Sequence, residues 1–133
     1  MLEHLNPRPK KPARVVVAGA AGFVGGAVAA RLERDGMTVL RLTRREVDLL
    51  APDADARLQA VLRTGDAFVA AAARAPCRNA GMLVENMKIA GAMVTALARA
   101  RVSHVVNISS DAVYADSPEP LTLWRNCGRC ASA

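Results

Sequence analysis

Three glycines spaced every third residue have a clear chemical use in this 133-residue sequence. Gly19, Gly22 and Gly25 follow a run of three valines and precede a strongly helix-forming stretch. Such glycines permit a sharp turn, let backbone N–H groups approach a phosphate, and allow the helix to lie close on the strand. The helix N-terminus then faces the phosphate. The pattern predicts a loop that binds the pyrophosphate of a dinucleotide, together with the intervening residues Ala21, Phe23 and Val24.

A secretory signal is the rival interpretation of this stretch. Basic residues around Lys10 and Lys11 lead into an apolar run from 15 to 30, and Ala27-Val28-Ala29 resembles a cleavage site. Four glycines within that run would each cost a helical signal about 1 kcal/mol relative to alanine. Because the turn of a dinucleotide loop uses these glycines, the loop is the favoured interpretation.

The residues after the second predicted strand decide whether the adenine ribose is recognised with a 2′-hydroxyl or with a 2′-phosphate. Thr43, Arg44 and Arg45 stand where an acidic residue would bond a ribose 2′-hydroxyl. A hydroxyl and two guanidinium groups suit a 2′-phosphate instead, which favours NADP over NAD. A solvated turn is the alternative for the two arginines. Asp48 and Leu49 follow, near the expected position of the adenine.

Small and hydroxyl side chains follow two later strands. Ala71, Ala72 and Ala73 would let a cofactor lie against the backbone, although an alanine-rich strand exit gives the same sequence. Ser109 and Ser110 follow the last strand. A serine hydroxyl beside a nicotinamide can donate a hydrogen bond to a substrate oxygen during hydride transfer, but an isolated Ser-Ser is also an ordinary strand exit.

The elements that must position these residues alternate along the chain. Strands are predicted at 14–18, 37–42, 46–50, 66–70 and 104–108, and helices at 22–35, at 53–62 and from 79 or 81 to 100. This alternation predicts an α/β, Rossmann-type doubly wound parallel sheet with strand order 3-2-1-4-5, incomplete at its C-terminal side. In the long helix, one apolar stripe is expected to pack in the core: Leu83, Met87, Ala90, Val94, Leu97 and Ala98.

Composition excludes several classes of protein. The chain is 52% hydrophobic and carries a net charge of +6, but its arginines are scattered among acidic residues with no aromatic-lined basic stripe, so no nucleic-acid partner is expected. No stretch reaches the roughly 18 apolar residues of a membrane helix. Three cysteines form no evident disulfide framework, which favours a reducing cytoplasm. Cys127 and Cys130 form a lone C-x-x-C pair, and no metal site is predicted.

With these residues in place, the chain resembles the extended short-chain dehydrogenase/reductase superfamily, and within it the NAD-dependent epimerase/dehydratase family. The resemblance rests on Gly-x-x-Gly-Phe-Val-Gly at 19–25, on the strand from Asp66 to Ala73, on Asn86 in an Asn-x-x-x-x-Gly helix start, and on Ser-Ser-x-x-Val-Tyr at 109–114. The link 44–49 is most similar to the deoxysugar-reductase branch.

The resemblance implies roles for particular residues. The glycine loop would hold the pyrophosphate of NAD(P), Asp48 and Leu49 the adenine, and Asn86 would belong to the cofactor site. Ser110 would be the catalytic hydroxyl that orients the substrate. In the complete family member, that substrate is a nucleotide sugar or a similar small secondary alcohol.

A proton-transfer pair that the resemblance calls for is missing from the sequence. The family has a Tyr-x-x-x-Lys beyond the serine, in which the lysine lowers the tyrosine pKa. Here Tyr114 is the only tyrosine and belongs to the Val-Tyr segment, and no lysine follows Lys88. Residues 123–133 also depart from the family and contain the only tryptophan.

These departures lead to an expected organisation of the chain. We expect a disordered leader at 1–12, an NAD(P)-binding domain at 13–122, and an atypical, out-of-frame or unrelated tail at 123–133 on a truncated, catalytically incompetent enzyme. An uncovered sheet edge then predicts self-association. The alternative is a non-catalytic NAD(P)-binding module that reports redox state to a partner.

Overall fold

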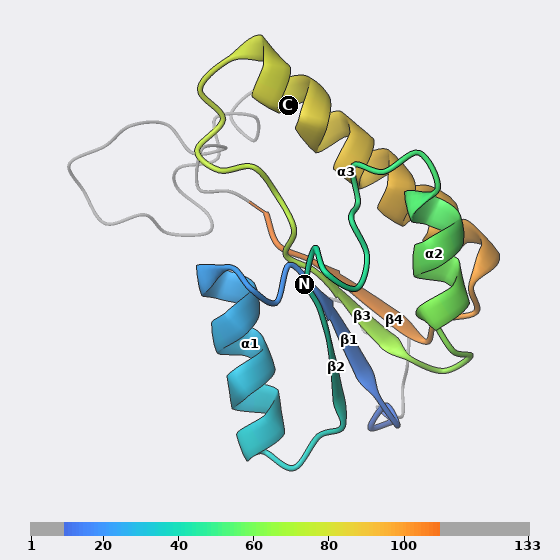
Figure 1. Cartoon of the computed structure of the whole chain (residues 1–133). Helices are drawn as coiled ribbons and strands as arrows, with labels where there is room; N and C mark the ends of the chain where they lie inside the picture. Colours follow the sequence, from blue (N-terminus) through green and yellow to red (C-terminus); the bar gives the residue numbers. More distant parts are fainter. Residues whose placement is uncertain (1–9, 110–133) are drawn as a thin grey trace, which may run out of the picture.

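The computed structural model describes residues 10–109, in which four parallel strands alternate with three helices (Figure 1). In chain order these elements are β1 (Val15–Ala18), α1 (Phe23–Arg34), β2 (Val39–Leu42), α2 (Ala54–Val61), β3 (Ala67–Ala70), α3 (Ala80–Arg99) and β4 (His104–Asn107). The strands are ordered β2-β1-β3-β4, with Ala18 opposite both Leu42 and Ala70, and Ala70 opposite Asn107. Their carboxyl ends therefore lie level along one edge.

Helices cover both faces of this sheet. Figure 1 shows α1 on one side and α2 with α3 on the other. Because side chains alternate along a strand, β1 contributes to two cores. Val15 and Val17 pack with Ala29 of α1, whereas Val16 packs with Phe68, with Leu58 of α2, and with α3. This arrangement confirms the predicted α/β, Rossmann-type fold.

The predicted strand at 46–50 is wrong, so the first member of the expected order 3-2-1-4-5 is missing from the described sheet. The segment is a succession of turns. The N–H groups of Glu46 and Val47 both donate to the carbonyl of Thr43, at 3.2 and 3.1 Å, and Leu50 N–H donates to Asp48 Oδ1 at 3.0 Å. Thr43 N–H in turn donates to Glu46 Oε2 at 2.8 Å. Local bonds of this kind, which resemble a helix capping box, compete with a strand ladder for the same groups.

The apolar stripe expected to bury α3 is also wrong: of its six residues only Leu97 packs against the core, and the other five are exposed. The helix buries Ile89, Met93 and Ala96, while Met87 and Val94 are 68% and 66% exposed. Both sides of α3 are apolar, so periodicity alone did not distinguish the core-facing side.

None of the helices among residues 10–109 combines the length and hydropathy needed to cross a bilayer.

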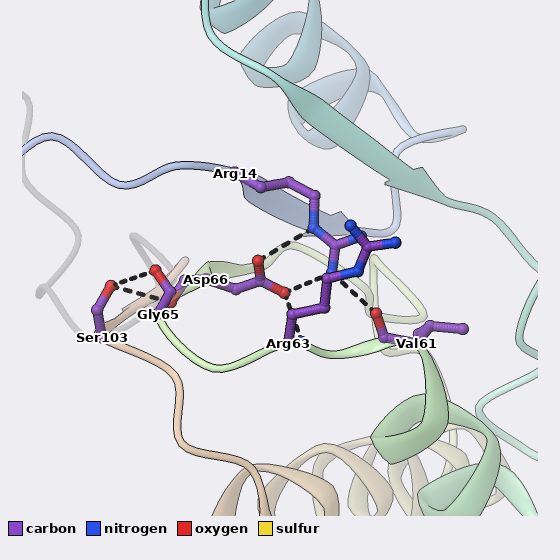
Figure 2. A network of polar contacts seen from close by, with 6 residues as sticks. All are labelled: Arg14, Val61, Arg63, Gly65, Asp66 and Ser103. Atoms are coloured by element: carbon purple, nitrogen blue, oxygen red, sulfur yellow. Dashed lines mark hydrogen bonds and ion pairs between the residues drawn. The ribbon is translucent and has the colours of Figure 1, made fainter.

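A buried ion pair joins the amino ends of β1 and β3 (Figure 2). The guanidinium of Arg14 donates to Asp66 through Nε (3.0 Å to Oδ1) and Nη2 (2.6 Å to Oδ2), and Nη2 also donates to Val61 O at 2.9 Å. Arg63 N–H donates to Asp66 Oδ2 at 2.8 Å, and Ser103 N–H donates to the backbone carbonyl of Asp66 at 2.7 Å. This network fixes the strands at the edge of the sheet opposite the glycine loop.

Candidate functional site

The loops that follow the strands are joined at the carboxyl edge of the sheet. Gly19 N–H donates to Leu42 O at 3.0 Å, Ala71 N–H donates to Ala18 O at 3.1 Å, and Ile108 N–H donates to Ala70 O at 3.1 Å. Each loop therefore starts from a fixed point on the neighbouring strand. In open parallel sheets, this edge is where ligands bind.

Two glycines of the loop 19–25 are required by the backbone. Gly19 has φ +82°, and a Cβ there would lie 2.8 Å from the carbonyl atoms of Ala71. A Cβ on Gly25 would overlap Gly19 O and would lie 2.8 Å from Gly19 C. Because these neighbours are backbone atoms, no rotamer change could relieve the overlap. The geometry matches the uses assigned to these glycines from their spacing.

The start of α1 suits an anion. The helix begins after Gly22, which supplies no side-chain cap, and its first turn holds no acidic residue. Within residues 10–109, the N–H groups of Phe23, Val24 and Gly25 have no hydrogen-bond partner. Free N–H groups at the positive end of a helix dipole are the usual ligands for phosphate.

A first cavity of about 190 Å³ lies between β1, β2 and the loop after β3. Its wall is largely apolar, from Leu42, Leu58 and Ile89 among others. It also brings together most of the residues expected to hold the adenosine half and the pyrophosphate: Gly19, Ala21, Gly22, Thr43, Arg44, Asp48, Leu49, Ala71, Ala72 and Ala73.

Three polar residues that line this cavity are paired: Thr43 with Glu46, which is not a lining residue, and Arg44 with Asp48. Glu46 Oε2 accepts hydrogen bonds from Thr43 N–H at 2.8 Å and from Thr43 Oγ1 at 2.5 Å. Those two bonds hold the pKa of the Glu46 carboxyl below its usual value. Arg44 Nε lies 3.7 Å from Asp48 Oδ1. Arg45 is exposed and lines neither cavity described here.

A second cavity of about 660 Å³ lies on the other side of the loop after β3. It is bordered by the start of α1, by Asn86 and Met93 of α3, and by Asn107, Ile108 and Ser109 at the end of β4. Phe23, which is 95% exposed, stands at its margin with Val24 and Gly25. Ala71, Ala72 and Ala73 line both cavities and form the wall between them.

Asn86 holds this wall in place. Its Oδ1 accepts from Arg74 N–H at 2.7 Å, and its Nδ2 donates to Arg74 O at 3.1 Å. The side chain of Arg74 is paired with Glu85, the preceding residue of α3, at 2.8 Å. The first turns of α3 therefore hold the loop after β3 in two ways: Asn86 is hydrogen-bonded to the Arg74 backbone, and Glu85 is paired with the Arg74 side chain.

Sequence reasoning missed three contributors to the site. Glu46 could have been found from Thr43-x-x-Glu46, the capping-box spacing. Asn107 is the last residue of β4 and the last but one of the predicted strand 104–108, and polar site residues commonly lie at such strand ends. Nothing in the sequence indicated Arg74, because its role depends on packing against α3. Ser110, Tyr114 and the segment 123–133 lie outside the described residues.

The comparisons with known proteins agree with this geometry. The chain is similar to a solved structure described as "Putative exported protein from Burkholderia pseudomallei", with 25% identity over 80% of this chain and a TM-score of 0.57. The match covers 52% of that chain, so this sequence spans about half its length. A search among curated proteins finds no match. The sequence profile of the NAD dependent epimerase/dehydratase family matches residues 15–129, which is most of the chain. The chain therefore belongs to the NAD-dependent epimerase/dehydratase family, whose members bind NAD(P).

Proposed function

We propose that this chain binds NAD(P) across the two cavities, within a domain spanning residues 13–122. The observation that carries the proposal is that the start of α1, which has no side-chain cap, borders two cavities that share the lining residues Ala71, Ala72 and Ala73. A dinucleotide is a long ligand with an anionic centre, so it needs two compartments on either side of an anion site.

Each part of the cofactor has a natural position. The pyrophosphate lies at the N–H groups of Phe23, Val24 and Gly25, the adenosine in the first cavity, and the nicotinamide in the second. Arg44 and Arg45, exposed beyond the end of β2, support a preference for NADP.

The substrate belongs beside the second cavity. Ser109 lines it, and Ser110 follows directly in the chain. We propose that Ser110 orients a nucleotide sugar or a similar secondary alcohol, and that the bound cofactor supplies hydride-transfer chemistry to it.

Turnover by these 133 residues alone is not expected. The sequence holds a single tyrosine, Tyr114, and no lysine after Lys88. Loss of a general acid–base group lowers rates by about 10²- to 10⁴-fold. The alternative is a module that reports redox state to a partner. It would be favoured if the chain bound a dinucleotide without turnover and if that binding also changed how the chain associates.

The test is a titration of the purified chain with NADPH and NADH, in which the fluorescence of the reduced nicotinamide and the thermal unfolding midpoint are followed together. Gly25→Ala should abolish binding, since its Cβ would overlap Gly19 O. Gly91→Ala is the matched control, because a Cβ on Gly91 meets no atom within 4 Å. A folded wild-type chain that binds neither dinucleotide, or a Gly25→Ala variant that binds normally, would refute the proposal.

A further inference from the structure

The donors that would meet a ribose 2′-phosphate are already occupied by a carboxylate of the chain itself. Thr43 is the first residue after β2 and lines the first cavity. Its N–H and its hydroxyl both donate to the same oxygen of Glu46, at 2.8 and 2.5 Å. Thr43 therefore presents its two donors to an anion, as a site for one phosphate oxygen would.

The charges around this contact are balanced. Residues 43–48 contain two arginines and two carboxylates, so the segment carries no net charge. Arg44 Nε lies 3.7 Å from Asp48 Oδ1, and the positive charge of Arg45 helps to lower the pKa of Glu46. Glu46 is ionised at neutral pH, because the bonds from Thr43 hold its pKa below the usual value.

The two cofactors differ at this point by one phosphate. A 2′-phosphate brings nearly two negative charges to Thr43, so it has to displace the Glu46 carboxylate and then remain near it. A 2′-hydroxyl is uncharged and can donate a hydrogen bond to a carboxylate. Glu46 therefore acts against NADP and is neutral or favourable toward NAD.

We propose that Glu46 is a specificity-determining residue that holds the site of the ribose 2′-phosphate closed, in opposition to Arg44 and Arg45. The inference rests on the proposed function. In this arrangement the segment 43–48 contains both the groups that attract the phosphate and the group that excludes it, and the difference between them sets the choice of cofactor.

Glu46→Gln tests the proposal, since glutamine can still accept from Thr43 but carries no charge. The variant should bind NADPH roughly tenfold more tightly, because a like charge beside the phosphate is gone. Its affinity for NADH should stay nearly unchanged. Adding Thr43→Val should reduce the gain, since it removes the hydroxyl donor and leaves only the backbone N–H to meet the phosphate.

Glu33→Gln is the matched control: it removes the same charge from the exposed pair of Glu33 with Arg41, away from both cavities. It should leave the ratio of NADPH to NADH affinities unaltered. Equal changes in both affinities for Glu46→Gln, an unchanged NADPH affinity, or the same gain in Glu33→Gln would overturn the inference while dinucleotide binding stands. A folded chain that binds neither dinucleotide would overturn the proposed function and this inference with it.

Discussion

Replacement of Asp66 by asparagine should strongly destabilise the fold. The carboxylate accepts two bonds from Arg14 and one from Arg63 N–H, and the side chains of Arg14 and Asp66 are only 14% and 4% exposed. Asparagine has the same shape, but its amide nitrogen would face a donor and it cannot neutralise the guanidinium. Breaking a buried pair costs about 3–5 kcal/mol. Arg14 keeps its bond to Val61 O, which places the expected loss near 3 kcal/mol.

Thermal unfolding gives a direct measure of this loss. A domain of this size loses about 4–8 °C in midpoint for each kcal/mol, so the Asp66→Asn midpoint should fall by about 12–24 °C. Glu33→Gln breaks an ion pair whose side chains are 43% and 41% exposed, and it should change the midpoint little. If Asp66→Asn lost no more than Glu33→Gln, the network of Figure 2 would not be what joins β1 to β3.

The same pair gives the stability a defined pH dependence. Burial raises the pKa of Asp66, but the hydrogen bonds from Arg14 and Arg63 N–H and the charge of Arg14 outweigh burial and lower it. A carboxyl whose pKa is lower in the folded chain stabilises the fold above its unfolded pKa of about 3.9. That stability is lost as the pH falls through the folded value. The difference in stability between wild type and Asp66→Asn should therefore be full at pH 7 and shrink below about pH 4, as measured by urea unfolding.

Two further predictions follow from the loop after β3 and from the edge of the sheet. Asn86→Ala removes both hydrogen bonds to the Arg74 backbone. It should weaken NADH and ADP binding together, because the wall between the cavities loosens. Titration of both ligands checks this, and an unchanged ADP affinity would instead indicate that Asn86 contacts only the nicotinamide half. We also propose self-association through β4, where Val105 and Val106 are 46% and 41% exposed. Light scattering should show association that Val105→Lys reduces, and a monodisperse wild-type monomer at high concentration would contradict it.

The backbone requirements of the site could be predicted from the sequence. Gly19 and Gly25 are needed because backbone atoms of neighbouring segments approach too closely for a Cβ, and this need appears in the sequence as a fixed spacing. The strands at 15–18 and 67–70 were also predictable, since buried parallel strands are continuous apolar runs.

The errors arose where a local contact or a second apolar face competed with the general pattern. The segment 46–50 contains alternating apolar residues typical of a strand, but the side chain of Glu46 bonds the backbone of Thr43 and favours a turn. In α3, Met87 and Met93 both belong to apolar stripes, and only contact with the sheet decides that Met93 is buried. The role of Asn86 depends on Arg74, twelve residues earlier, and no sequence period records that contact.

The wall formed by Ala71, Ala72 and Ala73 has a consequence for how ligands act on one another. Both cavities border these residues, and one side chain, Asn86, fixes the loop that follows them. A ligand in one cavity that restricts the remaining motion of these peptide units would leave less motion to be lost when a second ligand binds on the other side. Two halves of a dinucleotide supplied as separate molecules would then bind with positive cooperativity. By thermodynamic linkage, each half would raise the affinity of the other by the same factor.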